Sequence, residues 1–95
     1  MPLYAMICID HKGSLELRQK VRDDHLAYYR APGSPVRIAG ATLDENGQPE
    51  GSLVIIECES QVAAETFAAG DPFAKAGLFS SVSVKPWRLA IGAVS

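Results

Sequence analysis

The sequence has little of what several classes of protein require. Among its 95 residues there are only two cysteines, and no apolar run approaches the ~18 residues that a membrane-spanning helix needs. Lysine and arginine form no cluster and the net charge is −2, so we expect no nucleic-acid-binding surface. A glycine-rich phosphate loop is also missing, which leaves no sign of a bound nucleotide.

The two cysteines, Cys8 and Cys58, are too few for a disulfide framework or a metal motif. Both lie in apolar segments typical of strands, and we expect them to be buried free thiols. The chain offers too few His, Cys and carboxylate ligands at regular spacing for a metal site, and no cofactor is expected. The first residues lack the charged segment and cleavage site of a signal peptide, so a cytoplasmic protein is predicted.

The length predicts one domain spanning residues 1–95, because a chain this short cannot form two hydrophobic cores. The hydrophobic content of 47% is ordinary for a globular protein. A domain of this size buries only a modest apolar surface by itself, which favours self-association.

Periodicity and turn residues predict six main elements and one short helix. A buried strand at 3–9 precedes a helix at 14–30, which Pro32 and its neighbours end. The remaining elements are expected at 36–43 (strand), 51–58 (strand), 60–70 (helix), 71–77 (short helix) and 81–91 (a strand that Pro86 either confines to an edge or bends). The order β-α-β-β-α-β predicts an α+β fold of the ferredoxin-like type, with two helices on one face of an antiparallel sheet.

The first and third strands are apolar on both faces, although helices can cover only one face of such a sheet. The other face is therefore expected to pack against a second copy of the chain in a symmetric homodimer. A pocket enclosed by the two sheets is then the expected place for a small-molecule substrate.

His25 is the first candidate catalytic residue. The helix at 14–30 places it on the same face as Leu17, Val21 and Tyr28, where an apolar residue is usual. A histidine there is often a core-edge residue that bonds to the backbone or water. However, Arg22 lies nearly one turn earlier and favours an anion nearby, either a bound ligand or a carboxylate such as Asp71.

Asp71 is the second candidate. In the Asp71-Pro72 pair, the aspartate is a favoured N-cap and the proline a favoured first helical residue, so capping alone explains the pattern. A carboxylate held rigidly at a helix start can also orient an imidazole. If folding brings the two side chains together, His25 and Asp71 form a proton-transfer dyad.

Other candidates are weaker. Trp87 is equally well explained as the wall of a substrate pocket or as packing. His11 is expected in a solvated turn, and Asp23 and Asp24 on the helix surface, where adjacent residues point in different directions.

Four segments, taken in order, resemble the YCII (YciI-like) family over nearly the whole chain. Residues 22–26 match the pattern R-x-x-H-L. Gly40 with residues 51–57 resembles the second and third strands, residues 71–79 the segment D-P-[FY]-x-x-A-G-[LVI]-[FY], and residues 82–87 the closing strand V-x-V-x-P-[FW].

This resemblance implies a dimeric α+β barrel protein in which His25 and Asp71 form an acid–base dyad. It also implies a small, cofactor-free enzyme of the lyase or isomerase type, with dehydrochlorination of a hydroxylated aromatic ring as one such reaction. We expect Arg22 and Trp87 to bind the substrate. Two alternatives stay open: a non-catalytic ligand-binding or accessory module, and a cofactor-independent monooxygenase on the same topology.

Overall fold

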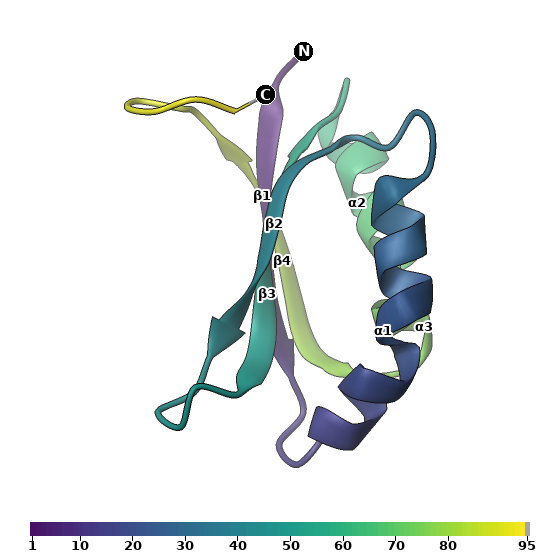
Figure 1. The fold of residues 1–95 in the computed structure, drawn as a ribbon. Helices are drawn as coiled ribbons and strands as arrows, with labels where there is room; N and C mark the ends of the chain where they lie inside the picture. The colour runs from purple at the N-terminus through teal and green to yellow at the C-terminus, as the bar shows by residue number, and fades with distance from the viewer. Residues whose placement is uncertain (95) are drawn as a thin grey trace.

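The computed structural model describes residues 1–94 and contains one sheet with three helices on one side (Figure 1). In chain order, the elements are β1 (Leu3–Asp10), α1 (Leu15–Arg30), β2 (Val36–Leu43), β3 (Pro49–Glu57), α2 (Gln61–Ala69), α3 (Pro72–Lys75) and β4 (Phe79–Trp87).

The four strands are antiparallel and lie in the order β2-β3-β1-β4. β1 is central, and its Met6 pairs with Val54 of β3 on one side and Val84 of β4 on the other. This arrangement confirms the α+β, ferredoxin-like fold expected from the order of elements.

Local signals set the helix and turn boundaries. The hydroxyl of Ser60 accepts a hydrogen bond from the Ala63 N–H and caps α2, as expected. Ser14 occupies the N-cap position of α1, but its side chain makes no capping bond. The β2–β3 hairpin closes through the Asp44 carboxylate, which accepts the backbone N–H groups of Asn46 and Gln48.

The core lies between the sheet and the helices. Met6, Val54 and Ile56 from the two central strands pack there with Ala64 and Ala68 of α2. Both cysteines are buried free thiols, as predicted. Burial, followed by the charge of Asp71, raises the pKa of the Cys8 thiol to about 12, so this residue acts as a small apolar side chain.

Two expectations from the sequence are wrong. The buried residues of α1 are Arg18, His25 and Tyr29, whereas Leu17, Val21 and Tyr28 are only half-buried. The buried face is therefore rotated from the apolar stripe, because a paired arginine occupies part of it.

The last strand also ends four residues earlier than the expected 91. Trp87 pairs with Leu3, the first residue of β1, so the chain beyond Trp87 has no strand residue left to pair with. β4 is an edge strand, as predicted, and Pro86 lies within it.

The sheet face opposite the helices is apolar and uncovered. Ile7, Ile9, Ile38 and Leu53 are each between 42% and 54% exposed. Figure 1 shows no helix on this side of the sheet. No helix of the described residues is long and apolar enough to span a membrane.

We predict that Gly51→Ala destabilises the protein by about 1–3 kcal/mol, because overpacking forces the backbone to shift. A Cβ atom at Gly51 would overlap the carbonyl oxygen of Cys8 and lie 2.6 Å from the Thr42 hydroxyl oxygen. Gly40→Ala is the control, since a Cβ there meets nothing within 4 Å. Urea unfolding of both variants tests this, and equal midpoints would contradict it.

Candidate functional site

The site is built around the start of α3, where Asp71 is fully buried. Its side-chain oxygen Oδ1 accepts the backbone N–H of Phe73 at 2.9 Å, and Pro72 occupies the first helical turn. This confirms the expected N-cap. Gly77, with a φ of 76°, then turns the chain into β4.

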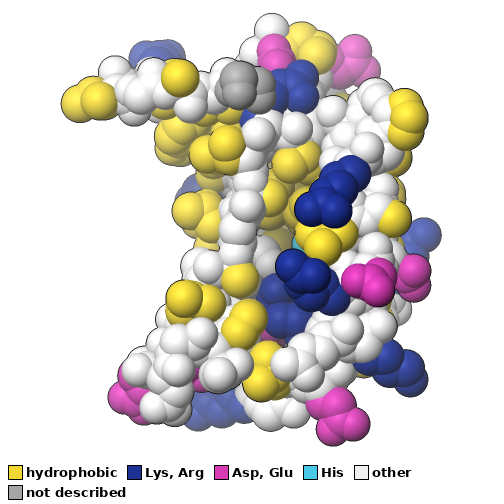
Figure 2. All heavy atoms as spheres, viewed as in Figure 1, with side chains coloured by type: hydrophobic (Ala, Val, Ile, Leu, Met, Phe, Trp, Pro, Cys, Tyr) yellow, Lys and Arg dark blue, Asp and Glu magenta, His cyan; other side chains and the backbone are white. Residues whose placement is uncertain are grey.

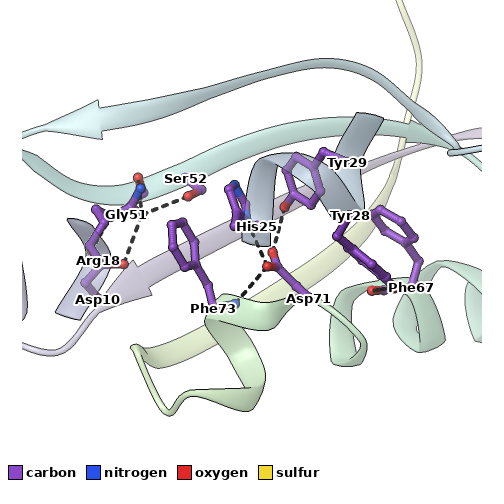
Figure 3. Close-up of polar contacts among 10 residues, drawn as sticks. All are labelled: Asp10, Arg18, His25, Tyr28, Tyr29, Gly51, Ser52, Phe67, Asp71 and Phe73. Atoms are coloured by element: carbon purple, nitrogen blue, oxygen red, sulfur yellow. Dashed lines mark hydrogen bonds and ion pairs between the residues drawn. The ribbon is translucent and has the colours of Figure 1, made fainter. Parts of the chain in front are cut away.

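His25 and Asp71 meet, although 46 residues separate them in the chain. The imidazole Nδ1 lies 2.7 Å from Asp71 Oδ1 (Figure 3), and His25 is only 7% exposed. Because a carboxylate accepts hydrogen bonds, Nδ1 carries the proton of the neutral ring. This leaves Nε2 as the basic nitrogen, and it makes no hydrogen bond to any residue in the described part of the chain.

Tyr29 is a second hydrogen-bond partner of the Asp71 carboxylate, and the sequence did not reveal it. Its hydroxyl donates a hydrogen bond of 2.9 Å to Asp71 Oδ2. Burial and the neighbouring carboxylate both raise the pKa of Tyr29, so the phenol keeps its proton. Asp71 therefore accepts hydrogen bonds from three groups on two helices, which suits an ionised carboxylate.

An aromatic ring fixes the imidazole from the other side. The His25 and Phe73 rings stack with centroids 3.8 Å apart and an interplanar angle of 10°. Since Phe73 is fully buried, the imidazole cannot tilt away without disturbing the core. Stacking and the bond to Asp71 together hold the ring in one orientation.

A buried ion pair lies on the other side of Phe73. Arg18 of α1 contacts Asp10 at the end of β1, with Nε 2.7 Å from Oδ2 and Nη2 3.2 Å from Oδ1. The Nη2 group also donates to the Gly51 carbonyl and the Ser52 hydroxyl, both at 2.9 Å. The sequence pattern hid this pair, because an isolated arginine beside an apolar stripe usually lies on the surface.

A cavity of about 290 Å³ lies between α1 and strands β2 and β3. Its lining residues are Arg18, Arg22, His25, Leu26, Tyr29, Arg30, Ala39, Gly40, Ala41, Ser52, Val54 and Phe73. This cavity lies on the helix side of the sheet, and the pocket expected between the two sheets of a dimer stays a prediction. His25 lines this cavity, and the fully buried Asp71 lies behind it, bonded to the imidazole Nδ1.

The other two predicted site residues, Arg22 and Trp87, lie in different places. Arg22 lines this cavity, but it is exposed and does not bond to Asp71. Trp87 does not line it; the indole borders a different hollow with Met1, Leu3 and Leu89, at the end of the sheet where the last strand pairs with Leu3. The two residues expected to bind the substrate therefore line different hollows.

No metal centre is evident at the site. Within residues 1–94, no group of three or more His, Cys, Asp or Glu side chains could hold an ion. His11 lies in an exposed turn between β1 and α1, as the sequence indicates.

The fold and site define a small α+β protein in which a histidine, hydrogen-bonded to a buried aspartate, lines a cavity. Residues 2–88 match the model of the YCII-related domain, and the chain belongs to the YCII family. Protein YciI of Escherichia coli O6:H1 is 37% identical over 94 residues, which cover 90% of this chain and 96% of that protein.

Solved structures agree with this assignment. The 5-chloro-2-hydroxyhydroquinone dehydrochlorinase TftG of Burkholderia phenoliruptrix, in complex with 2,5-dihydroxybenzoquinone, superposes with a TM-score of 0.83 at 32% identity. The match covers 93% of this chain and 95% of that one. A Bacteroides thetaiotaomicron protein described as a putative antibiotic biosynthesis monooxygenase, 13% identical over 99% of this chain and 93% of its own, has a TM-score of 0.60 and shares the fold alone.

We predict that Arg18→Met lowers the free energy of unfolding by about 3–5 kcal/mol, because Asp10 would keep a buried charge without its partner. Arg22→Met is the control: this arginine is exposed and should change stability by no more than about 0.5 kcal/mol. Urea denaturation measures both. If the two variants unfold at the same urea midpoint, the Arg18–Asp10 ion pair does not contribute the predicted free energy of unfolding.

Proposed function

We propose that this chain is a cofactor-free acid–base enzyme that acts on a small hydroxylated aromatic or quinone-type substrate, as a lyase or isomerase. The observation that carries the proposal is the His25–Asp71 contact of 2.7 Å at the wall of a cavity large enough for one aromatic ring. The similarity to TftG, a dehydrochlorinase, supports the same substrate class.

In this proposal Nε2 of His25 is the base. It takes a proton from a ring hydroxyl or an activated C–H, and the electron pair left on the substrate spreads into the ring system. The imidazolium then returns the proton to a ring carbon, which isomerises the substrate and restores the neutral imidazole. Where that carbon carries chlorine, the imidazole removes a second hydroxyl proton, the C–Cl bond breaks with its electron pair leaving as chloride, and the imidazolium releases its proton to solvent. Asp71 stabilises the imidazolium through Nδ1–H throughout.

Tyr29 and Phe73 act on the dyad indirectly. Tyr29 and the Phe73 N–H hold the carboxylate, and the Phe73 ring holds the imidazole, so the base does not need to reorganise when the substrate binds. The same bonds also join α1 to α3. The second candidate function is therefore a ligand-binding or accessory module, in which the His25–Asp71 bond is purely structural. The catalytic test must distinguish this role from catalysis.

We predict that His25→Gln lowers turnover by roughly 10²–10⁴-fold, the usual contribution of a general base, and that Asp71→Asn lowers it strongly as well. His11→Gln is the matched control, because the other histidine lies in an exposed turn. Chloride release and quinone absorbance, measured with 5-chloro-2-hydroxyhydroquinone and related quinols, provide the assay. Circular dichroism and thermal unfolding establish that each variant folds.

Unchanged turnover in a folded His25→Gln variant would rule out the dyad as the catalytic group. If the wild-type protein turns over no quinol but quinones shift the His25 NMR signals, the binding-module alternative gains support. If neither occurs, the His25–Asp71 bond is structural.

We further propose that the uncovered sheet face packs against a second copy of the chain. Ile7, Ile9, Ile38 and Leu53 form an apolar surface on this face, and leaving it in water is unfavourable. This face is opposite the helices, whereas the cavity lies between α1 and strands β2 and β3, so the dimer would stabilise the sheet that supports the cavity.

Leu53→Lys should therefore convert the protein from a dimer to a monomer of 10.2 kDa in sedimentation velocity runs. The lysine would place a charge in the middle of the apolar contact. Val62→Lys is the control, since Val62 is 70% exposed on α2, on the other side of the sheet. A wild-type protein that sediments as a monomer at all concentrations would refute the dimer.

A further inference from the structure

The lining of the cavity beside His25 contains arginines but no acidic residue. Arg18, Arg22 and Arg30 contribute to its wall, and no aspartate or glutamate does. The chain as a whole has a net charge of −2, so this local excess is not a result of a basic composition. Figure 2 shows basic side chains gathered along α1 beside the hollow, with hydrophobic atoms between them.

The three arginines differ in what they already bind. Arg18 is neutralised by Asp10 and buried. In contrast, Arg22 and Arg30 are exposed, and within residues 1–94 neither forms an ion pair with a carboxylate. Two guanidinium groups at the cavity therefore remain free to bind a ligand.

Helix geometry puts these two groups on one edge of the cavity. Arg22, Leu26 and Arg30 are spaced four residues apart, which places them on one face of α1, and all three line the cavity. His25 lies next to Leu26 and faces the same space. A ligand seated against Leu26 thus has a guanidinium on either side and the imidazole further in.

Ordinary helix stability explains only part of this arrangement. Arg30 lies in the last turn of α1, where a basic residue interacts favourably with the helix dipole. The same reasoning does not apply to Arg22, which follows Arg18 at a spacing of four, a like-charge pair that weakens a helix slightly. A shared role in the cavity accounts for both exposed arginines.

Building on the proposed function, we propose that the substrate carries a permanent anionic group, a carboxylate on or next to the aromatic ring. Arg22 and Arg30 bind this group at the cavity mouth, because guanidinium groups pair with carboxylates in a bidentate geometry. The acidic hydroxyl or C–H then points inward to Nε2 of His25. The cationic rim also favours the anion formed when that proton leaves.

The test compares two ligands of the same shape, 2,5-dihydroxybenzoate and the neutral 2,5-dihydroxybenzamide. We expect the wild-type protein to bind the carboxylate at least tenfold more tightly, as measured by NMR shifts of the Arg22, Arg30 and His25 signals. This preference should fall as sodium chloride rises, because added ions screen an exposed pair.

Arg22→Gln/Arg30→Gln should remove the preference while leaving the affinity for the benzamide unchanged. Lys20→Gln is the control, an exposed basic residue on the same helix that does not line the cavity. Equal binding of the two ligands by the wild-type protein, binding of neither, or a preference that survives in the double variant, overturns the proposal.

This test is independent of the catalytic one. If His25→Gln loses turnover of neutral quinols while the wild-type protein shows no carboxylate preference, the proposed acid–base function is supported. The proposal that the substrate carries a carboxylate is then refuted. If the carboxylate preference depends on Arg22 and Arg30 but no turnover is found, the proposal of an anion-binding site is supported and the proposed enzymatic function is refuted.

Discussion

The carboxylate of Asp71 is the point on which the site and much of the helical layer depend. It is fully buried, and a buried charge is tolerated only when its hydrogen bonds are satisfied. The three donors that satisfy it come from the middle and end of α1 and from the start of α3. Removing Asp71 would therefore loosen the docking of α1, the beginning of α3 and the orientation of the imidazole together.

The residues packed around this carboxylate also hold the His25 imidazole in position at the cavity. Phe73 is the shared element: its N–H holds Asp71, its ring stacks on His25, and the Arg18 guanidinium carbon lies 4.7 Å from its centroid on the other side. The Arg18–Asp10 pair in turn connects α1 to β1 and, through Gly51 and Ser52, to β3. These contacts form one connected set that holds the imidazole in place, whereas Arg22 and Arg30 line the same cavity as exposed side chains.

The fold was largely predictable, and the reasons are local. Strong apolar runs placed β1 and β3, and Ser60 and the Asp71-Pro72 pair marked the starts of α2 and α3. The end of the last strand was predicted wrongly, because it depends on a pairing partner far away in the sequence. β4 ends at Trp87 because its partner β1 begins at Leu3, and no pattern within the last strand itself contains that information.

The sequence by itself determined the order of elements, the two candidate residues His25 and Asp71, and the apolar second face of the sheet, because each follows from residue type and spacing. Only the tertiary structure decided which groups meet. It brought His25 within 2.7 Å of Asp71, added Tyr29 as a donor, buried Arg18 against Asp10, and separated Trp87 from the cavity. The physical reason is that residues far apart in the chain come together only through packing, which depends on how all the elements fit at once.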